Sequence, residues 1–597
     1  MDEHLPSVAR AVFDRYETSR EPFDEHELAS TVLAAAGPAD ALTPEQRHAV
    51  RLEISAFLYM PSTKPGVSVW GTYFAPSMTA TTKEGVEVNS PDIIREDEAT
   101  IAYWASRSDE AHHPILRARY ADLVWDFTGL VANRRPDVVF ARKAIDAYVE
   151  AIENKIYFHD SQAEDFAARA LSIALSINHK ARVQQVKGVF FDLDAAIGDV
   201  AKRGLWSMLF DNLYESPGVG LTDPERQSII DKLEHVLRVT TQQDQPLFEP
   251  WFAQGAAERL ERHYRRAGQM AEVHRVVRAY GHAFESAAGT ANAMLAVAWL
   301  QPVYDKYRDL GMNDDVYRVH QVLETRGHEA QTGMQRVQIP LQIDINEVNR
   351  VADALTEGDL QQAVRRIGIM FVPRADQVRA LNERIRRHAP LMSLIPITRY
   401  EAGHPAGIIG PQDQDAEGRL VHQMASQIGL DAIWLAATFD RLAERHAMTA
   451  DQIVDALLAS PVFASARRSI LVSGIEAWLS QDYIKAIHVL VPQVEHAVRT
   501  LASLSGVPAT TRGYTRGVMQ TRGLGEILHD RVFRQLIDEN VRRYLLVFLA
   551  DPRGINLRNR VAHGLLEHDQ MERALTDRVV QVLLALSCFA TKEQDPT

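Results

Sequence analysis

Near the C-terminus, an arginine and a histidine stand at a spacing that suits acid–base chemistry on a phosphate. Four residues separate Arg558 from His563, and Asn559 follows the arginine directly. Histidine exchanges protons near neutral pH, and a fixed guanidinium stabilises charge that grows on phosphoryl oxygens. Attack by the 2′-OH of RNA on its own phosphate needs both functions. Asn559 and His563 would share a helix face, where Asn559 would fix the imidazole or hold a phosphate.

The spacing alone does not single out this pair, because it occurs four times in the chain. The four pairs are Arg107 and His112, Arg399 and His404, Arg441 and His446, and Arg558 and His563. Only the last has Asn after the arginine, a helix-breaking Asp551-Pro552 before it and a long apolar helix after it. The structural alternative is that His563 caps a helix end and Arg558 forms a surface ion pair.

These residues need a helical bundle to position them, and the apolar spacing predicts one. The predicted helices are 482–504, 522–535, 537–550 and 569–590, with a short helical turn from Arg558 to His563 that ends at Gly564. Glu572, three residues after Asp569, predicts a capping box at the start of the last helix.

The first of these helices carries polar residues on one face. His488, Glu495 and Arg499 stand at i, i+7 and i+11, opposite an apolar face. This stripe is a candidate lining for the cleft, with Glu495 orienting Arg558 or His563. The alternative is a simple ion pair between Glu495 and Arg499 at i+4.

Charge is distributed unevenly along the chain. The net charge of -14 argues against a phosphate-binding surface over the whole molecule. The segment 499–560 nevertheless holds eleven Arg, no Lys and five acidic residues. Arginine forks match phosphate geometry, so this segment is a candidate RNA-facing surface. The candidate RNA-binding residues are Arg542, Arg543, Arg553 and Arg560. The alternative is that these arginines pair with acidic residues elsewhere in the chain.

The remaining sequence predicts a mainly α protein. Tyr264-Arg265, Gly268 and Val273 recur 43 residues later as Tyr307-Arg308, Gly311 and Val316, a period typical of HEAT- or TPR-like α-solenoids. A Gly-containing stretch at 391–410 suggests a small β-hairpin. Four domains are expected: a helical domain at 1–136 with a long loop or hairpin at 61–91, the α-solenoid at 137–335, a middle helical domain at 336–480 and the bundle at 481–597.

The sequence lacks the residues that several classes of binding site require. Cys588 is the only cysteine, so an internal disulfide and multi-cysteine metal sites are excluded, and phosphate-binding glycine loops are absent. We therefore expect no cofactor and no metal. The acidic N-terminus and the short apolar runs predict a cytoplasmic protein with no membrane association.

The string from Asp551-Pro552 through Arg558-Asn559 to His563-Gly564 resembles the HEPN superfamily, named for higher eukaryotes and prokaryotes nucleotide-binding. It is most similar to a bacterial family of unknown function whose eukaryotic relative is named for ER-membrane-associated RNA degradation. The resemblance covers roughly the last 120 residues. It implies a four-helix HEPN bundle and a metal-independent endoribonuclease that works as a homodimer. Arg558 and His563 would be the catalytic pair, supported by Asn559.

The resemblance also implies a biological setting. Bacterial relatives commonly act in antiphage defence or as toxins, which makes tRNA or another structured RNA the expected substrate. The helical N-terminal body would gate the enzyme, with a phage-derived or regulatory protein as a further partner. The competing hypothesis is a non-catalytic HEPN scaffold that dimerises through the bundle and binds a protein or peptide through the solenoid.

Overall fold

The computed structural model describes residues 5–62, 70–82, 87–202, 204–335, 342–446, 448–513, 515 and 517–590. Within these ranges the chain forms 27 α-helices and four two-stranded antiparallel hairpins, which confirms the mainly helical fold class. The chain divides into two compact units: Met1–Thr290 with Pro302–Val316, and Ala291–Gln301 with Tyr317–Thr597. Among the described residues we find no helix with the length and apolar character of a bilayer-spanning segment.

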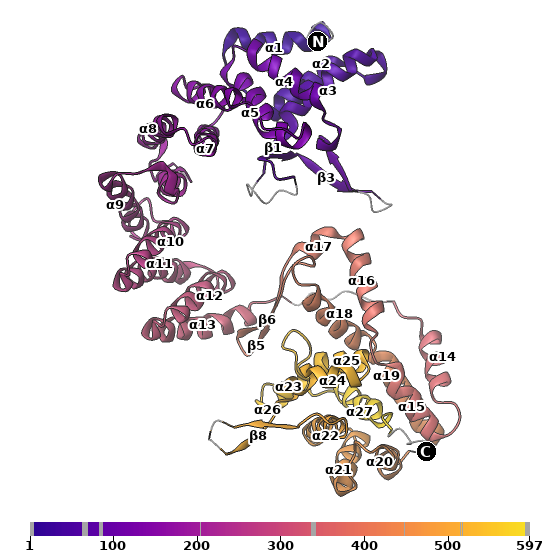
Figure 1. Cartoon of the computed structure of the whole chain (residues 1–597). Helices are drawn as coiled ribbons and strands as arrows, with labels where there is room; N and C mark the ends of the chain where they lie inside the picture. Colours follow the sequence, from indigo (N-terminus) through magenta and orange to yellow (C-terminus); the bar gives the residue numbers. More distant parts are fainter. Residues whose placement is uncertain are drawn as a thin grey trace. The chain divides into compact units, whose positions relative to one another are not determined.

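The first unit consists mainly of helices that pack on their neighbours in the chain (Figure 1). Polar side chains cap several of them: Thr43 accepts the N–H of Gln46 at the start of α3, and Asp97 accepts that of Thr100 at the start of α4. The helices are α1 (Ser7–Ser19), α2 (Glu25–Ala36), α3 (Pro44–Leu58), α4 (Glu98–Glu110), α5 (Pro114–Val131), α6 (Val138–Glu153), α7 (Asp160–Ser176), α8 (Lys180–Ile197), α9 (Asp223–Thr240), α10 (Pro250–Arg266) and α11 (Met270–Thr290).

The segment 61–91, predicted as a long loop or hairpin, contains paired strands. β1 (Tyr59–Pro61) pairs with β2 (Phe74–Pro76), and β3 (Met78–Thr81) pairs with β4 (Glu87–Ser90). The parts of this loop at 63–69 and 83–86 lie outside the described residues. The Asp126 carboxylate of α5 accepts the N–H groups of Tyr73 and Phe74 at 3.0 and 2.9 Å, which holds β2 against the helices.

A buried carboxylate ties three helices of this unit together. Asp122 accepts two hydrogen bonds from Arg169 at 2.8 and 2.6 Å and a third from Tyr148 at 2.9 Å. Its side chain is 0% exposed. A carboxylate removed from water is tolerated only when such partners replace its hydration, so these bonds fix how α5, α6 and α7 pack.

The predicted 43-residue repeat corresponds to two turns of the same geometry. Gly268 follows α10 at φ 72°, and Gly311 follows α12 (Ala293–Asp309) at φ 68°. In each turn, the residue after the glycine donates its N–H to the carbonyl five positions earlier. Gln269 donates to Tyr264 and Met312 donates to Tyr307, each at 2.9 Å. Glycine adopts this left-handed conformation without steric cost, so the repeat is confirmed at the level of its turns.

The second unit contains Ala291–Gln301, with the start of α12, and then most of α13 (Asn313–Thr332), from Tyr317 on, and all later elements. Its remaining helices are α14 (Ile345–Leu355), α15 (Leu360–Met370), α16 (Ala375–His388), α17 (Pro390–Leu394), α18 (Ala416–Leu430), α19 (Ala432–His446), α20 (Ala450–Leu458), α21 (Arg468–Leu479), α22 (Tyr483–Leu504), α23 (Leu524–His529), α24 (Arg531–Leu536), α25 (Glu539–Leu549), α26 (Leu557–Ala562) and α27 (Arg573–Ser587). The hairpins are β5 (Ile397–Glu401) with β6 (His404–Ile409), and β7 (Thr510–Arg512) with β8 (Met519–Thr521).

Helix α27 lies at the centre of this unit and contacts α15, α19, α20, α21 and α22. One hydrophobic core runs through the described residues from Leu355 to Leu586, so the segments predicted as a middle domain and a C-terminal bundle share it. The division into four domains stays a prediction, and its boundary at 336 lies outside the described residues. The predicted hairpin near 391–410 is confirmed by β5 and β6.

Two helix predictions need correction. The helix predicted at 522–535 is broken into α23 and α24, because Asp530 leaves the helical conformation and caps α24 through the N–H groups of Val532 and Phe533. The last helix begins at Arg573 rather than near Asp569, since His568–Gln570 forms a separate 3-10 turn.

We predict that Asp122→Ala destabilises the protein by about 3–5 kcal/mol, because the buried guanidinium of Arg169 loses two hydrogen bonds and its nearest counter-charge and keeps only the Asp126 carboxylate at 3.7 Å. Urea unfolding of the full chain, followed by circular dichroism, measures the effect. The matched control is Asp109→Ala, which removes a 71% exposed carboxylate paired with Lys143 and is expected to cost less than about 1 kcal/mol. Similar losses in both variants would contradict the role given to Asp122.

Candidate active site in the C-terminal unit

The segment that leads into the motif helix is held against α25. The N–H of Asp551 donates to the carbonyl of Leu546, and the N–H of Ile555 to the carbonyl of Val547, both at 2.8 Å. A Cβ atom on Gly554 would lie 2.3 Å from the Val547 oxygen, so only glycine permits this close approach. The predicted break before the motif helix is therefore confirmed, with a tightly packed loop in its place.

The motif itself lies on the short helix α26. Asn556 precedes the helix with a left-handed φ of 57°, and Gly564 follows it at φ 67°. The N–H of Leu565 donates to the carbonyl of Arg560 at 2.8 Å, which closes the helix in the pattern that favours glycine. This confirms the predicted short helical turn and its end at Gly564.

Arg558 is fixed by a carboxylate from α22. Its Nε donates to Oε2 of Glu495 at 2.7 Å and its Nη2 to Oε1 at 3.4 Å, while Nη1 donates to Oδ1 of Asn559 at 3.0 Å. The Asn559 amide in turn donates to Oδ1 of Asn556 at 2.8 Å. Arg558 remains 30% exposed, so its guanidinium is both anchored and accessible.

Glu495 serves two arginines. Besides Arg558, it accepts a hydrogen bond from Nη2 of Arg499 at 2.5 Å, so both alternatives considered for this carboxylate occur together. Burial acts to raise the pKa of Glu495, but the hydrogen bonds from Arg558 and Arg499 outweigh it and leave the pKa below the ordinary value. The carboxylate is therefore charged at neutral pH and anchors two cations on one side of α26.

The two candidate histidines are not part of this network. His563 is exposed at the C-terminal end of α26, and no hydrogen bond of its ring to another described residue is found. The Nδ1 of His488 donates to the carbonyl of Ile484 in its own helix, on the exposed side of α22. The structure thus brings together Arg558, Asn559, Glu495 and Arg499, and it leaves both imidazoles facing solvent.

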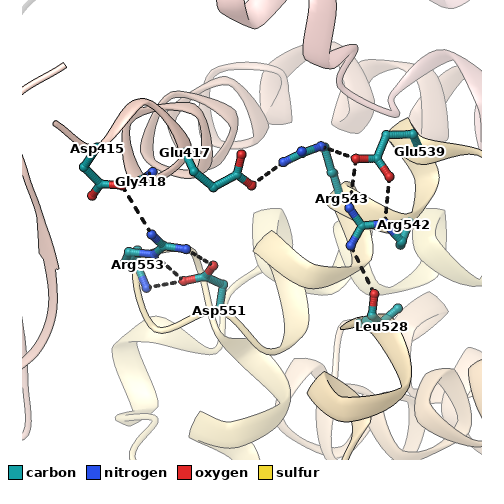
Figure 2. A network of polar contacts seen from close by, with 9 residues as sticks. All are labelled: Asp415, Glu417, Gly418, Leu528, Glu539, Arg542, Arg543, Asp551 and Arg553. Atoms are coloured by element: carbon teal, nitrogen blue, oxygen red, sulfur yellow. Dashed lines mark hydrogen bonds and ion pairs between the residues drawn. The ribbon is translucent and has the colours of Figure 1, made fainter. Parts of the chain in front are cut away.

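Arg542 and Arg543, two of the predicted RNA-binding residues, are buried in ion pairs. Their side chains are only 3% and 10% exposed. Figure 2 shows both guanidinium groups bound to Glu539, with Arg543 also paired to Glu417 and Arg542 donating to the carbonyl of Leu528. Because most of their donors are engaged inside the unit, these side chains are poorly placed to contact a phosphate, and their use in RNA binding stays a prediction.

Arg553 and Arg560 are also paired, although less deeply buried. Arg553 binds the Asp551 carboxylate at 2.9 Å and lies 3.7 Å from that of Asp415 (Figure 2). Arg560 pairs with Glu401 at 2.6 Å and donates to Gln570 at 2.6 Å. The alternative that these arginines pair with acidic residues elsewhere in the chain thus describes them correctly, and their use in RNA binding stays a prediction.

Sequence reasoning missed the β5–β6 hairpin as a neighbour of the motif helix. Glu401 reaches Arg560 from this hairpin, and Nη1 of Arg399 donates to the backbone carbonyls of Arg553 and Gly554. These partners are about 150 residues apart in the chain, and no local pattern links them. The glycines of this hairpin indicated its fold, and the Arg399–His404 spacing, one of four in the chain, drew attention to Arg399, but neither indicated contact with the motif helix.

Comparison with known proteins characterises only the first unit. Residues 67–186 match a family model described as a domain of unknown function, DUF7380. No curated protein and no solved structure matches the chain significantly. The matched segment begins near β2 and reaches into α8, and it contains the buried Asp122 and Arg169. Within the described residues, no group of three or more His, Cys, Asp or Glu side chains is placed to hold a metal ion.

We predict that Glu495→Gln lowers the free energy of unfolding by about 1.5–3 kcal/mol at pH 7, because charge-assisted hydrogen bonds to two arginines are lost. The lowered pKa means that Glu495 stabilises the fold fully above the ordinary glutamate pKa of about 4.3, and that this stabilisation declines as pH falls toward the lowered value. The difference between wild type and variant should therefore be constant from pH 6 to 8 and shrink only in acid.

Urea midpoints across this pH range test the prediction. Glu476→Gln, which changes an exposed carboxyl on α21, is the control and should show no such pH-dependent difference. Equal free energies of unfolding for wild type and Glu495→Gln at pH 7 would contradict the anchoring role of Glu495.

Proposed function

We propose that the C-terminal unit is a metal-independent endoribonuclease of the HEPN type that cuts tRNA or another structured RNA. The observation that carries this proposal is the way in which the Arg558 side chain is held. Three hydrogen bonds fix its guanidinium and leave one N–H free on each terminal nitrogen. A guanidinium that is anchored on one side and open on the other suits a phosphate, whose oxygens accept from both nitrogens.

The proposed reaction is an internal transesterification. His563 takes the proton of the ribose 2′-OH as that oxygen bonds to the adjacent phosphorus, and the P–O5′ bond breaks. The leaving O5′ takes a proton from a solvent water and becomes a 5′-hydroxyl, the hydroxide left behind is neutralised by the proton that His563 then releases, and the phosphate remains as a 2′,3′-cyclic ester. Arg558 stabilises the charge on the non-bridging oxygens, and Asn559 keeps the guanidinium in position.

A homodimer would complete the site. His563 stands five positions after Arg558, which places their side chains about 140° apart around a helix. No hydrogen bond joins the two side chains in the described residues of one chain. A two-fold interface that sets two copies of α26 against each other would bring the arginine and histidine of both chains to one phosphate.

Three exposed arginines provide a different RNA-facing surface from the one first predicted. Arg512 on β7, and Arg531 and Arg534 on α24, are exposed and have no ion pair among the described residues. Each can give its full guanidinium fork to a backbone phosphate. We propose that these side chains, rather than Arg542 and Arg543, hold the RNA near α26.

The biological role that we propose is bacterial antiphage defence or a stress response. An unrestrained ribonuclease harms its own cell, so the helical N-terminal part would gate the enzyme through a phage-derived or regulatory protein. The second candidate is a non-catalytic scaffold that dimerises through the same bundle. Its specific support is the ion pairing of Arg542, Arg543, Arg553 and Arg560, which removes most of the first predicted RNA surface.

We predict that purified wild-type protein cleaves RNA in the presence of EDTA. His563→Ala should lower the cleavage rate by about 10²–10⁴-fold, because general acid–base catalysis is lost. Arg558→Ala should lower it by about 10²–10³-fold, because an electrostatic donor to the phosphate is lost. Gel analysis of total tRNA under single-turnover conditions measures all three rates.

The control is His529→Ala, which removes an exposed imidazole from α23 and should leave the rate unchanged. Equal cleavage by wild type and His563→Ala would contradict the assignment, since the activity would then belong to another site or a contaminant. RNA that stays intact with every protein would favour the scaffold.

A further inference from the structure

A cavity of about 240 Å³ lies behind the motif helix in the second unit. It is bounded by the end of α13, the β5–β6 hairpin, the loop before α26 and the segment after it. Its lining includes Gln331, Arg399, Glu401, Arg560 and Gln570. Arg560 stands two residues after Arg558, or about 200° around the helix, so the cavity is on the opposite side of α26 from the proposed active site.

Arg399 is a cation of this cavity that forms no direct ion pair with a described residue, although the carboxylates of Glu401 and Asp551 act on its charge from nearby. Its Nη1 donates to two backbone carbonyls, and neither Nε nor Nη2 has a partner among the described residues. Arg560, in contrast, is already neutralised by Glu401 at 2.6 Å. Burial, and next the nearby charge of Arg560, lower the pKa of Arg399, against the opposing effect of the Glu401 and Asp551 carboxylates.

The walls of the cavity are closely packed, so its shape is set before any ligand binds. A Cβ atom on Gly327 of α13 would lie 1.5 Å from the carbonyl oxygen of Gly403 in the hairpin turn. The N–H of Gly403 also donates to the side-chain oxygen of Gln331 at 2.7 Å. A preformed cavity with fixed donors binds a ligand with little ordering cost.

We propose that this cavity binds a small molecule that carries an oxyanion, a phosphate or a carboxylate, with Arg399 as its main contact. The free Nε and Nη2 of Arg399 form the fork that binds two oxygens of such a group. The volume is below the roughly 300–1,000 Å³ of pockets for drug-sized ligands, which limits the ligand to the size of a sugar phosphate or a small carboxylic acid. The ligand would contact α13, the hairpin and α26 together.

Thermal unfolding of the full chain in inorganic phosphate, in acetate and in chloride at equal ionic strength tests the proposal. A bound anion should raise the melting temperature of wild type by about 2 °C or more over chloride, and titration calorimetry should give one site per chain. Phosphate or acetate, whichever acts, identifies the oxyanion. The experiment contains no RNA, so its result is independent of the proposed ribonuclease activity.

Two variants locate the site. Arg399→Gln removes the cation, and Ala406→Leu fills the cavity while keeping Arg399, so both should abolish the anion-induced rise even if their own stability differs. Arg379→Gln on the exposed face of α16 is the control and should respond like wild type. The proposal is overturned if no anion stabilises wild type over chloride, or if both cavity variants respond as wild type does.

Discussion

Pairing between arginines and carboxylates determines how the motif helix is placed. The chain has 79 acidic and 65 basic residues, so a carboxylate is available for most cations. Two arginines of α26 are paired on opposite sides of the helix. Arg558 pairs with Glu495 of α22, and Arg560 pairs with Glu401 of β5. Such pairs add little net stability compared with apolar packing, but removing one partner is costly. They therefore restrict α26 to one orientation and hold the Arg558 guanidinium at the surface.

The C-terminal bundle is also joined by hydrogen bonds to the helices that precede it in the chain. On α27, the buried Arg578 donates to the carbonyls of Phe371 and Ile428, and Gln581 donates to that of Gly368. These bonds satisfy the ends of α15 and α18 with side chains of the bundle, which explains why one core spans both segments. A change at the β5–β6 hairpin would reach Arg560 directly, since Glu401 belongs to that hairpin.

Features set by local chemistry were predictable from the sequence. The helical spacing of apolar residues predicted α22 and α25. Glycines predicted the turns at Gly268, Gly311 and Gly564, and the backbone is left-handed at all three. The β7–β8 hairpin was missed, because its exposed strands show no alternation of apolar and polar residues. The cap at Asp530 was also missed, since Asp is common at both helix starts and exposed loops.

The partners of the arginines could not be predicted in the same way. A cluster of arginines is equally compatible with a nucleic-acid surface and with internal ion pairs, and only the fold distinguishes them. Arg543 meets Glu417 and Arg560 meets Glu401, each pair far apart in the chain. For the same reason, the sequence placed Glu495 on the correct helix face without deciding which arginine it binds.

The chemistry of the RNA ends tests the central claim most directly. Wild-type protein would be incubated with a defined tRNA in EDTA, and both ends at each break would be identified by mass spectrometry. The proposed role of the 2′-OH, with Arg558 and His563 acting on the phosphate, predicts 2′,3′-cyclic phosphate and 5′-hydroxyl ends, and no cut where the 2′-OH is replaced by hydrogen. Breaks with 5′-phosphate and 3′-hydroxyl ends, or cuts that persist without the 2′-OH, would contradict it.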